Sequence, residues 1–147
     1  MKFKAKFAAG LILVGVTISG ASAWAFVLDE MVIDYRQQIM KAKDAQATAI
    51  GHILTGTVPN DNIVSHFESL LLATRQTREA FETKVEGGDA LPGIWEDWDD
   101  FCAKLDAAES GINKAIEAIN RNGPGAAGDV ALGALGCKGC HDTYRKK

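Results

Sequence analysis

Near the C-terminus, three side chains have the types and spacing suited to binding a metal cofactor. Cys137 and Cys140 lie three positions apart, and His141 directly follows the second cysteine. Residues three apart lie on one face of a helix, so both thiols can form thioethers with the two vinyl groups of a haem. His141 can then bind the iron as the proximal ligand. This C-x-x-C-H spacing predicts one haem c, covalently attached through two thioethers.

Other uses of the cysteines fit the rest of the sequence less well. A structural zinc site needs two further ligands, and the chain has no second C-x-x-C and no H-x-x-x-H. A redox dithiol is expected after a strand, and no strand-like alternation precedes Cys137. The third cysteine, Cys102, is in helical phase with Trp98 and Leu105, so we expect a small buried hydrophobic residue rather than a reactive thiol.

The N-terminal segment predicts that the protein is exported. Three lysines within the first six residues precede an apolar run over residues 7–18, and small residues follow. This pattern is typical of a secretory signal peptide, which would cover residues 1–23, with cleavage after Ala23 or, alternatively, after Ala25. The run is shorter than the ~20 apolar residues that span a bilayer. We therefore expect a periplasmic protein whose mature domain covers residues 24–147, and not an integral membrane protein.

The charge of the mature region limits the class of partner. The full chain has 16 basic and 19 acidic residues, which gives a formal charge of −3. Removing the three lysines of the leader leaves 13 basic residues against 19 acidic ones, which moves the charge to −6. Phosphate backbones repel such a surface, so we do not expect a nucleic-acid-binding protein.

Helical periodicity dominates the mature region, with no convincing run of alternating strand residues. Apolar residues that recur every three or four positions predict helices at about 29–54, 61–85, 92–120 and 127–145. Asn60 or Asp61 is expected to cap the second of these helices, and Gly87-Gly88 to end it. Four amphipathic helices with short connections predict an all-α protein: an antiparallel four-helix bundle, up-down-up-down, with the haem in its core near the C-terminal helix.

Three segments of the chain resemble the class II c-type cytochromes, specifically the cytochrome c prime family. They are residues 35–41, 86–95 and 137–147. The resemblance extends over essentially the whole mature chain, and it implies that Arg36 and Gln37 contact the haem propionates and that Asp89 makes another haem contact. A guanidinium is chemically suited to a propionate. Because members of the family often form dimers through their first two helices, a homodimer is a further expectation.

Met40 follows Arg36 by four positions, so the two side chains lie on one face of the first helix. In the family this position faces the side of the iron opposite the proximal histidine. A methionine there binds the iron in the low-spin branch, whereas in most members a bulky side chain blocks the site without binding. The first interpretation is therefore an electron carrier whose iron is bound by His141 and Met40. The alternative is a five-coordinate protein that binds nitric oxide or carbon monoxide, with Met40 as a steric plug.

An enzymatic role is less consistent with the residues around Met40. Peroxidase chemistry needs a histidine or arginine acid–base pair above the iron. The first helix has Lys41, Lys43 and Asp44 near Met40, whereas His52 is twelve residues further on, about 18 Å away at ~1.5 Å per residue. We therefore expect a carrier or gas-binding protein and not an enzyme. Its partners would be an unidentified redox protein or small diatomic gases.

Overall fold

The computed structural model describes residues 20–128 and 136–147, with side chains from residue 27 onward. Its elements are α1 (Gly20–Leu54), α2 (Ile63–Glu82), α3 (Gly93–Glu96), α4 (Trp98–Asn122), η1 (Pro124–Ala127) and α6 (Cys137–Tyr144). Within these residues there is no strand, and isolated bridges join Ala90 only to Gly87 and Arg145. No helix in this part of the chain is long and apolar enough to cross a membrane. The all-α prediction is confirmed.

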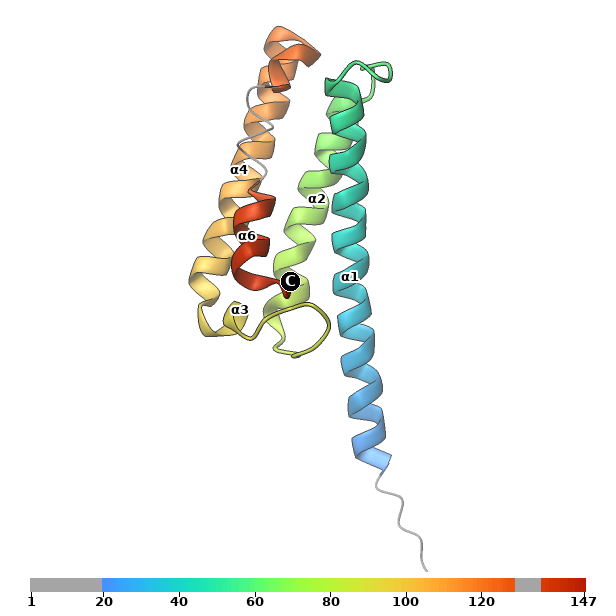
Figure 1. The fold of residues 1–147 in the computed structure, drawn as a ribbon, viewed down its shortest axis with the longest axis vertical. Coiled ribbons are helices and arrows are strands. Elements are labelled where there is room, and N and C mark those ends of the chain that lie inside the picture. The colour runs from blue at the N-terminus through green and yellow to red at the C-terminus, as the bar shows by residue number, and fades with distance from the viewer. Residues whose placement is uncertain (1–19, 129–135) are drawn as a thin grey trace, which may run out of the picture.

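The long helices lie side by side, and their connections alternate between the two ends of the molecule (Figure 1). α2 contacts both α1 and α4, and α6 packs against α3 and α4. The up-down-up-down bundle predicted from the sequence is therefore confirmed. The fourth helix was predicted at about 127–145; its described parts are η1 and α6, and residues 129–135 lie outside the described residues.

The buried residues form two clusters, one in each half of the bundle. The upper cluster in Figure 1 joins α1, α2, α4 and η1 and contains Ile50, Ile53, Ile63, Phe67, Leu70, Ile112, Ala115, Ile119 and Ala127. The lower cluster joins α1, α2, α3, α4 and α6 and contains Ile39, Ala80, Phe81, Ile94, Phe101, Leu105 and Tyr144. Met40, Ala90, Trp95, Trp98 and Cys140 are partly buried against the lower cluster. The predicted haem-attachment helix thus belongs to the lower half.

The third predicted helix is interrupted, and its prediction as one continuous helix was wrong. Asp97 lies between α3 and α4 with φ −130° and ψ 62°, outside the helical region. Its carboxylate accepts a hydrogen bond from the Asp100 N–H at 3.3 Å, which caps the start of α4. The apolar pattern conceals this break because Trp95 and Trp98, on either side of it, both pack against the lower cluster.

The other helix boundaries differ from the prediction by a few residues. α1 ends at Leu54 as predicted but begins at Gly20, so cleavage after Ala23 would remove its first residues. α2 begins at Ile63 with Asn62 at its N-cap, and the Asn62 side chain makes no capping bond. The predicted caps, Asn60 and Asp61, were therefore wrong, and the end of α2 at Glu82 is explained by contacts with α1 described below.

Candidate haem site

Helix α6 positions the two cysteines one turn apart at the edge of the lower cluster. The helix begins at Cys137, immediately after Gly136, whose φ of 55° lies in the left-handed region that favours glycine. The Cys140 N–H donates to the Gly136 carbonyl at 3.2 Å, which closes the first turn. Cys137 is exposed, whereas Cys140 is half-buried and packs against the cluster that also contacts Met40. Both sulfurs can therefore reach one planar group beside the cluster.

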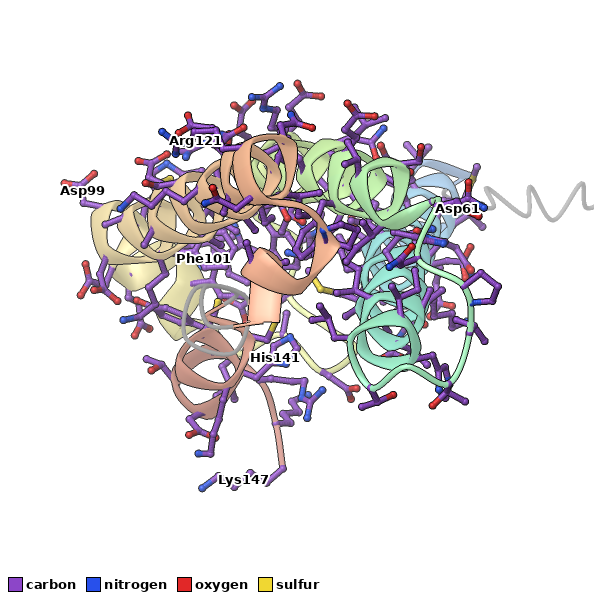
Figure 2. The ribbon with its side chains drawn as sticks, turned by 90° about the horizontal axis from the view of Figure 1, so that it is seen from above. Asp61, Asp99, Phe101, Arg121, His141 and Lys147 are labelled. Carbon is purple, nitrogen blue, oxygen red and sulfur yellow. The ribbon has the colours of Figure 1, made fainter. Side chains whose placement is uncertain are left out.

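His141 is half-buried on α6 and points toward α1 (Figure 2). Burial lowers the pKa of its imidazole, and the positive charges of Arg145 and Lys43 lower that pKa further. The neutral imidazole is the form that binds iron. The surroundings of His141 therefore favour its ligating form.

Tyr144 fixes the orientation of α6 against α4. Its ring is buried and meets the Phe101 ring edge-on, with 5.5 Å between the centroids and an interplanar angle of 83°. Its hydroxyl donates to Asp100 Oδ2 at 2.5 Å, and Lys104 contacts the same carboxylate at 3.3 Å. The bond from Tyr144, and secondarily the one from Lys104, lower the pKa of Asp100. Because Tyr144 is three residues after His141, these contacts also position the histidine.

Backbone hydrogen bonds attach the end of α6 to the turn at residues 87–91. The Leu91 N–H donates to the Tyr144 carbonyl at 3.0 Å, and the Lys146 N–H donates to the Asp89 carbonyl at 2.9 Å. The Asp89 carboxylate itself is on an exposed residue. The structure thus brings the backbone of Asp89 beside the haem-attachment segment and leaves its side chain at the surface.

The same turn packs closely on α1. Gly87 has φ 146°, and a Cβ atom there would lie 2.5 Å from Ile33 Cδ1. At Gly88, with φ 57°, a Cβ atom would lie 3.3 Å from Gln37 Nε2. The two glycines therefore allow the turn to approach α1, rather than ending α2 as predicted. Gln37 is an exposed residue whose amide lies against this turn.

Arg36 holds the end of α2. Its guanidinium is buried and donates from Nε to the Ala80 carbonyl at 2.9 Å, from Nη1 to Val85 at 2.6 Å and from Nη2 to Thr83 at 2.6 Å. Ala80 lies in the last turn of α2 and Thr83 is its C-cap, so two of these bonds satisfy carbonyls that have no partner within the helix, and the third holds the segment that follows it. They account for the end of α2 at Glu82.

Two aromatic rings complete the surroundings of Arg36. Its guanidinium carbon lies 4.6 Å from the Phe81 ring centroid and 5.1 Å from that of Trp95, within the range of cation–π attraction. Burial lowers the pKa of Arg36, as expected for a desolvated cation. Sequence reasoning missed this capping role. The contact between Arg36 and a haem propionate stays a prediction. It would use the guanidinium N–H groups that do not bond to the three carbonyls.

Met40 lies one turn beyond Arg36 and is half-buried against the lower cluster, which Cys140 contacts from α6. Lys43 follows one turn later and is also half-buried. The site therefore brings Met40, Cys140 and His141 to facing sides of α1 and α6, whereas Gln37 and Asp89 lie at the exposed edge.

These residues fit a covalently attached haem. Two cysteines one turn apart can form the thioethers, and the imidazole of His141 beside them, whose pKa is lowered by burial, can bind iron. Partly buried apolar side chains of Met40, Trp95 and Trp98 offer a surface for the flat, apolar macrocycle. When bound, the haem would supply an iron that can change oxidation state and bind small ligands.

Comparison with known proteins agrees with this description. A sequence model of the family described as Cytochrome C' matches residues 31–145. Cytochrome c' of Alcaligenes xylosoxydans xylosoxydans is 33% identical over 131 residues, which cover 83% of this chain and 98% of the relative. Cytochrome c-556 of Agrobacterium tumefaciens is 31% identical over 120 residues, which cover 78% of this chain and 97% of that relative.

Solved structures of cytochrome c prime from Alcaligenes xylosoxidans are similar to this chain over most of its length. A nitric oxide complex of a leucine-to-isoleucine variant superposes with a TM-score of 0.68 at 32% identity, covering 81% of this chain and 97% of that one. A carbon monoxide complex of a leucine-to-glycine variant gives a TM-score of 0.69 at 32% identity, with the same coverage.

Proposed function

The chain belongs to the cytochrome c prime family and carries one covalently attached haem c, and on this basis we propose that it binds nitric oxide or carbon monoxide at a five-coordinate iron. Cys137 and Cys140 would hold the haem through thioethers, and His141 would bind the iron. Met40 would cover the opposite face of the iron without binding it. This proposal is the alternative interpretation from the sequence, and the nitric oxide and carbon monoxide complexes of similar proteins support it over the electron carrier.

The packing of Met40 is the observation that carries this proposal. Its side chain is half-buried against the apolar lower cluster, together with Trp95, Trp98 and Cys140. A methionine held by such contacts can act as a flexible plug, since its unbranched chain adapts to a small incoming ligand. The wall around it is apolar, which suits an uncharged diatomic gas.

No histidine competes with Met40 for the open side of the iron. Besides His141, the chain has only His52 and His66. His52 is exposed near the end of α1, and His66 Nδ1 is hydrogen-bonded to Gln46 Oε1 at 2.8 Å. Both lie in the upper half of the bundle, away from α6.

The second candidate function is electron transfer by a haem that Met40 ligates. The observation that favours it is the sulfur of Met40, a residue of α1 that packs against the same cluster as Cys140 of α6. Ligation by methionine raises the reduction potential, which suits an electron carrier. An unidentified redox protein would then be the partner.

Optical spectra of the purified protein and its Met40→Leu variant test the two functions. Leucine fills a similar volume but has no sulfur. We expect a high-spin ferric spectrum in both proteins, a clean spectral shift when carbon monoxide is added to either reduced form, and no far-red sulfur-to-iron band. A far-red band that Met40→Leu abolishes, with carbon monoxide binding only in the variant, would contradict the plug and support the electron carrier.

Export and dimer formation complete the proposal. A leader cleaved after Ala23 or Ala25 would deliver the chain to the periplasm, and the intact mass of the periplasmic protein would identify the cleavage site.

The exposed apolar residues Val27, Met31 and Tyr35 on α1 support a homodimer through this helix. Light scattering of the haem-loaded protein measures its mass directly, and a monomer at all concentrations would contradict the dimer.

A further inference from the structure

The turn at residues 87–91 contacts both helices that would enclose the haem. In the part of the chain that the structure describes, α1 packs on α2 and η1, and α6 packs on α3 and α4, but α1 and α6 do not pack extensively on each other. The connection between α2 and α3, which contains the turn, lies at the lower end of the bundle beside the C-terminus (Figure 1). The turn therefore links the helix of Met40 to the helix of His141.

The attachment of the turn to α1 is close. A Cβ atom at Gly87 would lie 2.5 Å from Ile33 Cδ1, and one at Gly88 would lie 3.0 Å from Ile33 Cγ2. Arg36 also fixes the segment that leads into the turn, through its two hydrogen bonds of 2.6 Å to carbonyls beyond the end of α2. Because Ile33 and Arg36 lie about two turns and one turn before Met40, the turn is fixed to the part of α1 that carries Met40.

The attachment of the turn to α6 consists of hydrogen bonds to the residues at the end of that helix. The two backbone bonds described above, at 3.0 and 2.9 Å, flank an antiparallel bridge between Ala90 and Arg145. The Lys146 ammonium donates a third bond to the Gly88 carbonyl at 2.8 Å. Since Arg145 is the C-cap of α6 and lies four residues after His141, these bonds hold the end of the helix that carries the histidine.

We propose that the 87–91 turn is a rigid spacer that sets the separation of α1 and α6, and so positions Met40 and His141 on the two sides of the haem. A second bridge, between Gly87 and Ala90, closes the turn on itself, so that it transmits a displacement from one helix to the other. The gas site needs such a spacer, because Met40 must lie close enough to cover the iron and far enough to leave it unbound. This inference deepens the proposed function and rests on its placement of the haem between the two helices.

In the alternative, purely structural role, the turn only connects α2 to α3, and its contacts add stability. A substitution at the α1 end of the spacer distinguishes the two roles. Gly87→Ala would push the turn away from α1 through its contact with Ile33, and Ile33→Val, which lacks Cδ1, would relieve that contact in a double variant. Gly56→Ala is the matched control: Gly56 also has a left-handed φ, of 72°, but an added Cβ would meet nothing within 4 Å in the described part of the chain.

A substitution at the α6 end of the spacer acts on the other helix. Lys146→Pro removes both the backbone donor and the ammonium of this residue. The preceding residue, Arg145, already has the extended conformation that a following proline favours, with φ −118° and ψ 139°. Lys147→Pro places the same ring one residue later and serves as the control. Lys146→Met, which removes only the ammonium, repeats the measurement should the proline variant fail to take up haem.

Amide hydrogen exchange and carbon monoxide titration of the haem-loaded proteins test the proposal. We expect Gly87→Ala and Lys146→Pro each to accelerate exchange of the Leu91 N–H, which bonds to the end of α6. Each should also raise the affinity of the ferrous protein for carbon monoxide about fivefold, because α1 could then move away from α6 and Met40 would yield to the ligand. The two control variants should match the wild type, and the double variant should return toward it.

The outcomes separate this inference from the proposed function. Faster exchange with an unchanged affinity for carbon monoxide and an unchanged haem spectrum would mean that the turn is only structural, and would overturn the proposal. Exchange that neither variant changes would overturn it as well. A far-red sulfur-to-iron band in the wild type, with no carbon monoxide binding, would instead refute the open iron site. The spacer would then be supported by a weaker band in Gly87→Ala and Lys146→Pro, and overturned by an unchanged one.

Discussion

The two halves of the bundle bury different kinds of side chain. The upper cluster consists of aliphatic residues and Phe67, each at most 7% exposed, and it contains no charged group. The lower cluster is rich in aromatic rings and lies beside the buried guanidinium of Arg36. Its margin includes Met40, Trp98 and Cys140, which are only partly covered by protein.

This difference separates stability from function within one bundle. In the upper half, apolar side chains are buried against one another and away from water, which stabilises this half without a cofactor. In the lower half, partly exposed apolar groups surround the thiols and the imidazole, and a haem would cover them. The lower half is therefore expected to depend on the haem for part of its stability, because a group that binds only the folded state stabilises it.

A truncation in each half provides the strongest test of this separation. Phe67 is fully buried, so Phe67→Ala should lower the free energy of unfolding by about 3–5 kcal/mol and leave the haem spectrum unchanged. Trp98→Ala, at the partly exposed margin of the lower cluster, should cost less stability but alter the haem spectrum. Urea unfolding and absorption spectra of the haem-loaded variants measure both effects. Equal spectral changes in the two variants would contradict the separation.

Substitution of Arg36 tests whether the hydrogen bonds of its guanidinium stabilise the lower half. Arg36→Met removes the donors of three carbonyls at and just beyond the end of α2, two of them in buried hydrogen bonds, so we expect a loss of about 3 kcal/mol in the free energy of unfolding. Arg75→Met is the matched control, since Arg75 is an exposed arginine of α2 that pairs with Glu109, and its loss should cost less than about 1 kcal/mol.

A similar small loss in Arg36→Met and Arg75→Met would show that the carbonyl bonds contribute little. The predicted propionate contact has a separate signature in the same variant. It requires a lower affinity or an altered spectrum of the haem, which a role limited to capping α2 would not produce. Comparing the haem-loaded Arg36→Met protein with the wild type before unfolding measures this signature.

Local patterns predicted the architecture and the centre of the site. Cofactor attachment depends on the spacing of Cys137, Cys140 and His141 within one helical turn, so the sequence alone carries the signal. The end of α1 at Leu54 follows from a break in the apolar period. The expectation that Met40 faces the open side of the iron came from the resemblance, and it stays a prediction.

Features that depend on distant contacts could not be predicted in this way. Arg36 bonds to carbonyls 44 to 49 positions further along the chain, and only the packing of α1 against α2 brings them together. Asp97 interrupts a helix without disturbing the apolar period, since a break of one residue leaves Trp95 and Trp98 on the same cluster.

The smallest expected effect concerns Tyr144, the residue that attaches the haem helix to α4. The Tyr144 hydroxyl lowers the pKa of Asp100 in the folded protein, so the bond stabilises the fold when Asp100 is ionised. This stabilisation is complete above the unfolded pKa of an aspartate, about 3.9, and is lost as the pH falls through the lower folded value. Tyr144→Phe should therefore be less stable than the wild type at neutral pH, and the difference should shrink below about pH 4.

Urea unfolding at neutral and acidic pH measures this change, and Tyr35→Phe is the control because Tyr35 is exposed on α1. The haem spectrum of Tyr144→Phe also reports whether the orientation of His141, three residues away, depends on this bond. A stability difference that stays constant with pH would mean that the hydroxyl acts through another group, such as the Asp97 carbonyl at 3.5 Å, which does not titrate. In that case a neutral contact would attach α6 to α4.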